Sequence, residues 1–319
     1  MDWSGKHALV TGGAGFIGSH VVDALVARKA RVTVVDNFST GFHEFVPPRE
    51  GLRVVEADLL DMRAVEKAME GVDFVFHMAA NADIRDNLKQ PRLCIDQNLI
   101  ATQNVLEAMR AAGTSKIAFA STGSVYGEAT VFPTPETAPF PVQTSIYATS
   151  KVAAEGLLSS YAWGFGLQTW AFRFVSLLGP RYTHGHVWDF WRKLKRDPSR
   201  LEVLGDGKQR KSYLHVSDCV AAILVAIDKA GEQTNVFNLG HDESVIVNQS
   251  IAIITRTLGV TPRLEYTGGT RGWVGDSPRI ELDISRIRAL GWAPTKTIEA
   301  SIVDTLRFLD ANPFTEKRS

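Results

Sequence analysis

The chain contains a tyrosine and a lysine spaced for chemistry on one helix face. Tyr147 and Lys151 lie four residues apart at the start of a segment, 147–161, whose apolar spacing predicts a helix, so both side chains should project from one face. A tyrosine with a pKa of about 10 is a poor base at neutral pH. A neighbouring ammonium group favours the phenolate and lowers that pKa. The pair is therefore a candidate general base, although the same spacing also occurs on helices that do no chemistry.

Hydroxyl groups upstream of this pair strengthen the interpretation. The segment 121–127 contains Ser121, Thr122 and Ser124 and follows an expected strand at 116–120. By itself the segment could be a serine-rich turn. In the right order before Tyr147 and Lys151, however, it places a hydroxyl where it could hydrogen-bond a substrate oxygen while a hydride leaves or reaches the adjoining carbon.

A glycine-rich loop near the start of the chain predicts a dinucleotide site. From residue 11 the sequence is Thr-Gly-Gly-Ala-Gly-Phe-Ile-Gly-Ser-His, with Gly12, Gly15 and Gly18 at intervals of three. A buried-strand pattern at 7–10 precedes the loop and helical apolar spacing follows it, which is the context such a motif requires. Glycine allows the tight turn, and the helix N-terminus then faces a pyrophosphate.

An acidic residue at the end of the next strand indicates which dinucleotide binds. The strand expected at 31–35 ends at Asp36, about twenty residues beyond the loop, where a carboxylate accepts from the ribose hydroxyls. Asp36 would repel a 2′-phosphate and no arginine follows it directly, so the cofactor should be NAD, not NADP. The oxidised nicotinamide would add positive charge near Tyr147 and lower its pKa further.

The surrounding pattern predicts an α/β fold of the Rossmann type, a doubly wound parallel sheet. Strand and helix patterns alternate through the first 175 residues, and Asp36, Asp58, residues 77–80 and 121–122 all fall at the carboxyl ends of expected strands. We expect an NAD-binding domain over residues 1–175 with returning segments near 213–241. The loop-richer remainder, 176–319, should mainly form a smaller C-terminal α/β domain for the substrate.

Composition excludes several classes of partner. The chain has 319 residues, with 35 lysines plus arginines and 35 aspartates plus glutamates, so no bulk charge indicates nucleic acid or an anionic membrane. No apolar run approaches a membrane span, and the residues before the first strand leave no room for a signal peptide. Two cysteines fit no metal spacing and His184 and His186 lack partner ligands, so we expect no metal and a cytoplasmic location.

Together these motifs resemble the extended short-chain dehydrogenase/reductase family, in its nucleotide-sugar epimerase branch typified by UDP-glucose 4-epimerase. The resemblance covers nearly the whole chain. It rests on the glycine loop, Asp36-Asn37, Asp58-Leu59, residues 77–80, 98–102 and 121–127, Tyr147/Lys151, residues 173–181, 205–207 and 213–216, Gly275-Asp276 and residues 290–292.

The resemblance implies roles for individual residues. Thr122, Tyr147 and Lys151 should be catalytic. The NAD site should comprise Gly12, Gly15, Phe16, Ile17, Gly18, Asp36, Asn37, Asp58, Leu59, Met78, Ala79, Ala80, Asn98, Ser121, Tyr147, Lys151 and Phe174. The nucleotide-sugar site should comprise Thr122, Ser124, Ser176, Arg181, His186, Val187, Lys211, Tyr213, Arg271 and Asp276. A homodimer is implied through the helices Asn98–Ala111 and Tyr147–Tyr161.

Departures from the family pattern narrow the reaction. Sugar-nucleotide 4,6-dehydratases carry an Asp-Glu pair where this chain has Gly123 and Ser124, and decarboxylases place a glutamate at the second of these positions. On the substrate side, the usual asparagine of an Arg-x-x-Asn motif is Ser176, an Arg-Asp pair is replaced by Lys211-Ser212, and an arginine before Asp276 is replaced by Trp273. These changes leave the redox machinery intact but affect the nucleotide-sugar side.

The preferred hypothesis is an NAD-dependent epimerase that inverts C4 of a UDP-hexose or UDP-uronic acid. Tyr147 would take the proton of the 4-hydroxyl, the 4-keto sugar would turn over, and the hydride would return to the other face. Two alternatives remain. One is a net NAD-dependent nucleotide-sugar dehydrogenase or keto-reductase, and the other is a non-catalytic nucleotide sensor on the same fold.

Overall fold

The centre of the molecule is a parallel sheet. The structure, a computed structural model, describes the chain except for residues 83–87, 141, 273–276, 278 and 318–319. Seven strands of the described chain pair in the order β3-β2-β1-β4-β5-β6-β11, and every pairing is parallel. They are β1 (His7–Thr11), β2 (Arg31–Asp36), β3 (Leu52–Glu56), β4 (Phe74–His77), β5 (Lys116–Ala120), β6 (Gln168–Phe174) and β11 (Thr234–Leu239).

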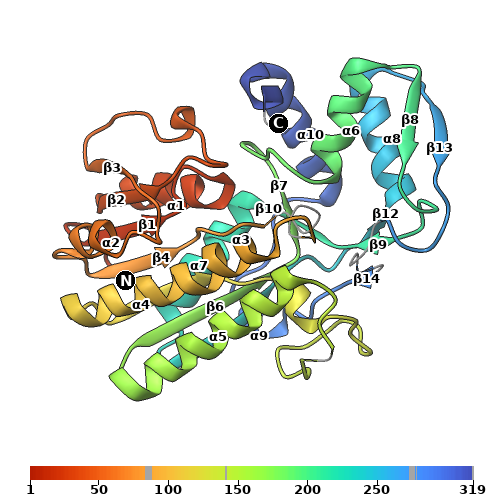
Figure 1. The fold of residues 1–319 in the computed structure, drawn as a ribbon. Coiled ribbons are helices and arrows are strands. Elements are labelled where there is room, and N and C mark those ends of the chain that lie inside the picture. The colour runs from red at the N-terminus through yellow and green to blue at the C-terminus, as the bar shows by residue number, and fades with distance from the viewer. Residues whose placement is uncertain (83–87, 141, 273–276, 278, 318–319) are drawn as a thin grey trace.

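Helices cover both faces of this sheet (Figure 1). One face is buried under α1 (Phe16–Val26) and α7 (Val216–Lys229), whose apolar side chains share a core with alternate residues of the strands. The opposite face is buried under α2 (Met62–Met69), α4 (Ala101–Ala112) and α5 (Ile146–Phe165). Burial on both faces explains why the strands are apolar throughout and do not alternate with polar residues.

The strand order reverses between β1 and β4, where a doubly wound sheet opens a crevice at the carboxyl ends of its strands. The expected fold class is confirmed. Asn235–Leu239, expected to return to the sheet, lies in β11 beside β6, and α7 packs against α1. The domain boundary at residue 175 stays a prediction.

The helix expected over 98–111 has a more complex start. A short α3 (Pro91–Ile95) leads into a π-helical turn, Asp96–Ile100, before α4 begins at Ala101. Such turns insert one extra residue per turn and are frequent at functional sites. The insertion rotates Asn98 inward, where it is almost completely buried.

The remaining residues after β6, outside α7 and β11, form smaller elements, many of which surround a separate apolar cluster. The sheets here are β7–β10, β8–β13 and β12–β9–β14. Their bounds are β7 (Ser176–Leu178), β8 (Arg200–Val203), β9 (Arg210–Lys211), β10 (Tyr213–His215), β12 (Val245–Ile246), β13 (Arg263–Tyr266) and β14 (Arg279–Ile280). The helices are α6 (His186–Arg196), α8 (Val247–Leu258), α9 (Ser285–Arg288) and α10 (Ile298–Ala311).

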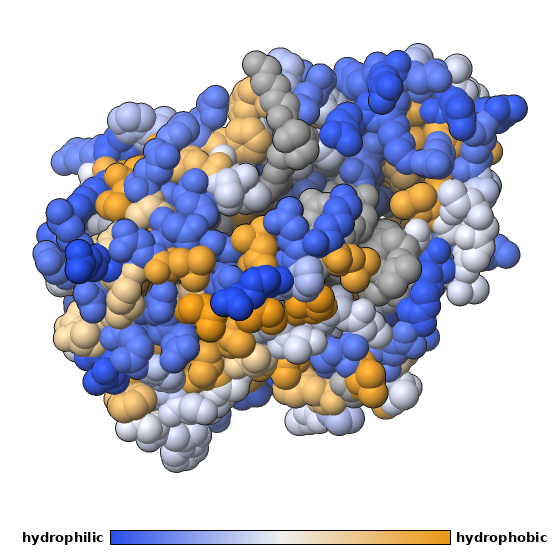
Figure 2. Space-filling view, viewed as in Figure 1, coloured by the Kyte–Doolittle hydropathy of each residue, from blue (hydrophilic) through white to orange (hydrophobic). Residues whose placement is uncertain are grey.

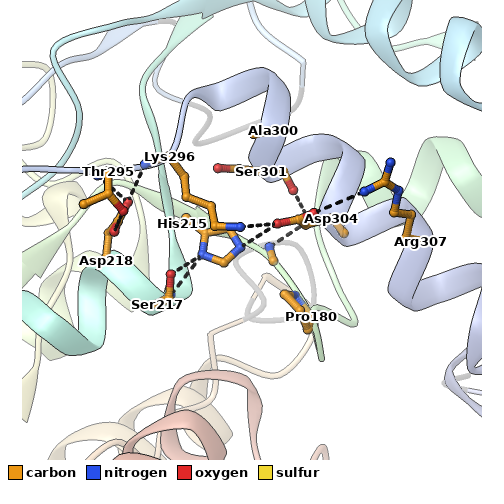
Figure 3. A network of polar contacts seen from close by, with 12 residues as sticks. Pro180, His215, Ser217, Asp218, Thr295, Lys296, Ala300, Ser301, Asp304 and Arg307 are labelled. Atoms are coloured by element: carbon orange, nitrogen blue, oxygen red, sulfur yellow. Dashed lines mark hydrogen bonds and ion pairs between the residues drawn. The ribbon is translucent and has the colours of Figure 1, made fainter.

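A polar network joins α7, α10 and the segment between α9 and α10 (Figure 3). The Asp218 carboxylate accepts from the backbone N–H groups of Thr295 and Lys296 at 2.9 and 3.0 Å. His215 Nδ1 accepts from the Ser217 N–H at 3.1 Å and so caps α7, while its Nε2 faces Asp304 at 3.6 Å. The network fixes the end of β10, the strand that pairs with β7.

Within the residues that the structure describes, no helix combines the length and hydrophobicity needed to cross a bilayer. The same part of the chain has no group of three or more His, Cys, Asp or Glu side chains arranged to hold a metal ion. Cys94 and Cys219 are both buried free thiols.

Candidate active site

The glycine loop after β1 has the close packing that a pyrophosphate site requires. Gly12 has φ +65°, and a Cβ at this position would lie 2.6 Å from the Ala79 Cα. A Cβ on Gly18 would overlap the Gly12 carbonyl. Helix α1 follows with Gly15 as its N-cap, without a side-chain cap and without an acidic residue in its first turn. Its first N–H groups are thus available to an anion.

Asp36 lies beside this loop at the carboxyl end of β2. Its carboxylate accepts from the Ala14 and Phe38 N–H groups, each at 2.9 Å, and is largely buried. Burial raises its pKa, although the two backbone hydrogen bonds oppose that rise. The position fits a carboxylate that receives ribose hydroxyls and excludes a 2′-phosphate.

Replacing Asp36 with asparagine should therefore weaken the preference for NAD over NADP. Removing a like charge that costs several kcal/mol should reduce the ratio of the two affinities by about 100-fold. Titration calorimetry of protein stripped of cofactor measures both dissociation constants. Asp61→Asn, which removes the charge of the exposed N-cap of α2, is the control and should leave the ratio unchanged. An unchanged ratio in Asp36→Asn would refute this role.

The residues expected near adenine form a polar cluster of their own. Asp58 accepts from Asn37 Nδ2 at 2.9 Å and from Gln97 Nε2 at 3.0 Å. Burial raises the pKa of Asp58, but these bonds and the Leu60 N–H outweigh burial and hold it below its usual value. Leu59 is buried beside it. The adenine contact stays a prediction.

The segment after β4 adjoins the glycine loop. The Met78 N–H donates to the Thr11 carbonyl at 3.1 Å. This bond holds the segment Met78, Ala79 and Ala80 beside the end of β1. His77 is fully buried and bonds Thr11 Oγ1 at 2.7 Å. Burial lowers its pKa to about 3, so the ring is neutral. His77 is therefore a neutral, hydrogen-bonded residue of the core.

The side chain of Asn98 forms hydrogen bonds to other residues of the protein. Its Oδ1 accepts from the Asn81 N–H at 2.7 Å, and its Nδ2 donates to the Asn81 carbonyl at 3.0 Å and to Ser150 Oγ at 3.0 Å. It therefore ties the segment after β4 to α5. This geometry supports a role in shaping the cofactor crevice, and a direct contact with NAD stays a prediction.

Lys151 occupies the second turn of α5, whose start is fixed by the Ser145 side chain accepting from the Ala148 N–H at 3.1 Å. Its Nζ donates to the Ala120 carbonyl at 2.8 Å at the end of β5. Burial lowers the pKa of this amine to about 7, and the neighbouring Cys94 and Glu155 charges offset only part of that effect.

Tyr147 and Thr122 lie together across the gap between α5 and the turn after β5. Their hydroxyls are hydrogen-bonded, and Thr122 Oγ1 also bonds Ser124 Oγ at 3.2 Å. Burial raises the pKa of Tyr147 to about 12 and outweighs the bond from Thr122. The expected lowering by Lys151 is thus not produced by the protein alone, because desolvation of the phenol is the larger effect. The positive charge of oxidised nicotinamide would act in the expected direction.

A buried acid beside this site escaped the sequence analysis. Glu155 lies one turn after Lys151 on the same face of α5 and forms an ion pair with Arg173 at 2.7 Å. It also accepts from Ser121 Oγ. The spacing of Tyr147, Lys151 and Glu155 at successive intervals of four was the available signal.

Three of the expected substrate residues lie together around β7 and β10. Ser176 on β7 is exposed and pairs in register with Tyr213 on β10. The His186 ring packs on the Tyr213 ring with centroids 4.9 Å apart, and its Nε2 bonds Ser250 Oγ at 3.0 Å. Burial lowers the pKa of His186 to about 3, so it presents a neutral imidazole.

Other expected substrate residues are more dispersed. Arg181 Nη1 pairs with Asp23 of α1 at 2.7 Å, which occupies its guanidinium. Val187 is fully buried in the C-terminal cluster and its N–H bonds Tyr182. Their substrate contacts stay predictions. Arg271 is exposed and pairs with Glu128 at 2.5 Å.

Lys211 lies half-buried on β9. Asp276 falls outside the described residues. Of the remaining expected cofactor residues, Phe16 packs edge-on against Tyr182 at 5.5 Å and Ile17 packs on the main core. Phe174 is buried at the end of β6.

The doubly wound sheet has a glycine loop at its first crossover, and a tyrosine–lysine pair faces a hydroxyl at the end of β5. This combination defines a nicotinamide-dependent enzyme of the extended short-chain dehydrogenase/reductase type. The residues present fit NAD, since the loop, Asp36 and Lys151 meet at one edge of the sheet. The chain belongs to the NAD dependent epimerase/dehydratase family, which residues 8–240 match.

Relatives within this family are similar over most of their length. The putative UDP-glucose 4-epimerase of Methanocaldococcus jannaschii is 32% identical over 310 residues, which cover 95% of this chain and 98% of that protein. UDP-glucuronate 4-epimerase 4 of Arabidopsis thaliana is 30% identical over 331 residues, covering 96% of this chain and 75% of that protein. A solved UDP-galactose 4-epimerase has a TM-score of 0.88 and 38% identity, covering 96% of this chain and 99% of the other.

Proposed function

We propose that the protein is an NAD-dependent epimerase that inverts C4 of a UDP-hexose or UDP-uronic acid through a transient 4-keto sugar. One observation carries the proposal: Thr122, Tyr147 and Lys151 converge at the edge of the sheet that holds the glycine loop. The names of the relatives support the nucleotide-sugar substrate.

In this reaction Tyr147 accepts the proton of the 4-hydroxyl, and Thr122 hydrogen-bonds the same oxygen as it becomes a carbonyl. Lys151, held by the Ala120 carbonyl, provides positive charge close to the phenolate. Bound NAD supplies the hydride acceptor and donor. Tyr147 returns the proton after the keto sugar has presented its other face.

Related dehydratases and decarboxylases need further acids, and the structure shows what occupies those positions. Gly123 packs against the Phe174 carbonyl, to which a Cβ would be only 3.1 Å away. The neighbouring position holds Ser124, whose hydroxyl is bonded to Thr122. Without a carboxyl group at either position, elimination across C5 and C6 or decarboxylation has no acid–base partner there.

The proposed substrate is tested with purified protein and a panel of UDP-glucose, UDP-glucuronate and their N-acetyl counterparts, followed by proton NMR. A new C4 epimer of at least one sugar is expected. Net oxidation that requires added NAD, or the absence of any epimer, would overturn the proposal. Denaturing a separate sample of the purified protein should release NAD in stoichiometric amount.

For substrate binding we propose Ser124, Ser176, His186, Lys211, Tyr213 and Arg271, with Arg181, Val187 and Asp276 as further candidates. The support is the grouping of Ser176, Tyr213 and His186, which lie together in the structure. The shorter Ser176 and the lysine at 211 should alter the fit of the sugar nucleotide relative to an asparagine and an arginine.

We also propose a homodimer formed through α4 and α5. Apolar side chains gather over α3 and α5 on the face shown in Figure 2. Leu93 of α3, Ile100 of the π-helical turn before α4 and Trp163 of α5 are exposed by 40%, 38% and 76%. A surface helix of a monomer normally has a polar outer face.

We also propose a cytoplasmic location. Cys94 and Cys219 are buried free thiols, which suit a reducing compartment, and cell fractionation tests the location.

Gly156 offers a direct test of the dimer. It is exposed on α5, and a Cβ there would meet nothing within 4 Å, so Gly156→Glu should leave the protomer folded. A charge in the interface should shift sedimentation at micromolar concentration from dimer to monomer. Gly231→Glu, at an equally open position after α7, is the matched control. A monomeric wild type, or a dimer in Gly156→Glu, would contradict this interface.

A further inference from the structure

The Glu155–Arg173 ion pair lies directly beneath the catalytic residues and has no part in the mechanism above. Both side chains are almost entirely buried, with exposures of 8% and 6%. Arg173 Nε and Nη2 both donate to Glu155, the latter at 2.7 Å. A buried charge pair is costly unless its geometry is well satisfied, so its partners must hold a narrow range of positions.

The pair contacts the catalytic turn on both sides of Thr122. Ser121, immediately before Thr122, donates its hydroxyl to Glu155. Tyr126, four residues after Thr122, accepts from Arg173 Nη1 at 2.7 Å and donates to Asn238 Oδ1 at 2.7 Å. The turn that carries Thr122 is therefore attached to the ion pair at its start and at its end.

The same pair is attached to the helix that carries the other catalytic residues. Glu155 belongs to α5, two turns after Tyr147, whereas Arg173 belongs to β6. A buried junction thus joins the Thr122 turn, β6 and α5. Satisfied buried networks are rigid and specify a single arrangement.

We propose that Glu155 and Arg173 are positioning residues that hold Thr122 against Tyr147. The effect on kcat that this inference predicts rests on the proposed function. Neither residue is catalytic, since both act through Ser121, Tyr126 and the backbone of the turn.

The junction has a consequence that a merely stabilising pair would not have. Burial raises the pKa of Tyr147, and the hydrogen bond from the Thr122 hydroxyl lowers it. If the Thr122 turn moves away from α5, the phenolate loses a hydrogen bond and the pKa of Tyr147 rises. The rising limb of the pH–rate profile then moves to higher pH.

Two variants of the NAD-loaded enzyme test this inference. Glu155→Gln keeps the shape of the side chain but removes its charge, and Ser121→Ala keeps the ion pair but removes its bond to the start of the turn. Misplacement of a catalytic group lowers kcat by about 10- to 100-fold, and KM should change far less. Ser121→Ala remains informative if Glu155→Gln does not fold.

The control is Thr114→Val, which removes a buried hydroxyl bonded to the Val72 carbonyl at 2.9 Å, just before the other end of β5. It should lower the melting temperature without changing kcat. Ultraviolet titration of tyrosinate, with Tyr147→Phe as the reference to be subtracted, reports the Tyr147 pKa independently of turnover. A rise of this pKa in both variants is expected.

An unchanged Tyr147 titration and unchanged kcat in Ser121→Ala would overturn the inference, as would an equal loss of kcat in Thr114→Val. If the wild type converts no sugar of the panel, the proposed function fails, while the titration still decides whether the junction positions Thr122.

Discussion

Tyr147→Phe is expected to lower kcat for C4 epimerisation by about 10²- to 10⁴-fold, the range that general acid–base groups contribute. The ring and its packing remain, so binding of NAD and UDP-sugar should persist. The loss should fall on kcat because only the proton-transferring hydroxyl is removed. Steady-state kinetics by NMR or a coupled assay, together with the NAD content of the purified variant, measures both quantities.

Tyr161→Phe is the matched control for this prediction. It removes a hydroxyl from the same helix, where Tyr161 donates to Glu107 at 2.5 Å, far from Thr122. Its kcat should stay close to that of the wild type. If Tyr147→Phe retained full turnover, Tyr147 could not be the acid–base group and the mechanism would be wrong.

Lys151→Met should produce the second large loss, about 100-fold or more in kcat. Methionine fills similar volume, but it removes the amine one turn from Tyr147 on α5 and its bond to the Ala120 carbonyl. Burial already raises the pKa of Tyr147 to about 12. Loss of the positive charge that Lys151 can carry would further disfavour the phenolate. The alkaline shift of the pH–rate profile should accompany the loss of kcat.

A lysine elsewhere provides the comparison. Lys229 Nζ donates to the Leu290 carbonyl at 2.7 Å near the end of α7, and Lys229→Met should alter stability without altering kcat or its pH dependence. Lys151→Met with wild-type kcat and pH profile would show that the lysine has no electrostatic role.

The sequence was sufficient to predict the sheet and the meeting of its motifs. Apolar strands alternating with helices require a sheet covered on both faces, and parallel strands bring their carboxyl ends to one edge. Gly12, Asp36, Thr122 and Lys151 each follow or face such an end. Their convergence is therefore a consequence of the topology.

Quantities that depend on burial could not be predicted. The tyrosine–lysine spacing indicated a lowered pKa for Tyr147, whereas desolvation raises it, and desolvation depends on every segment packed around the phenol. The ion pair between Arg181 and Asp23 could not be predicted either, because Asp23 lies on a helix more than a hundred residues earlier. Glu155 was overlooked because an acid on a helix is usually exposed.

The central claim is that the hydride removed from C4 returns to the same carbon. Its most direct test is epimerisation in D₂O without added cofactor. Purified protein and the UDP-sugar that it converts would be followed by proton NMR at the C4 hydrogen. A hydrogen removed and returned within a closed site does not exchange with solvent, so the epimer should carry protium at C4. Deuterium at C4, or dependence on added NAD, would contradict the account.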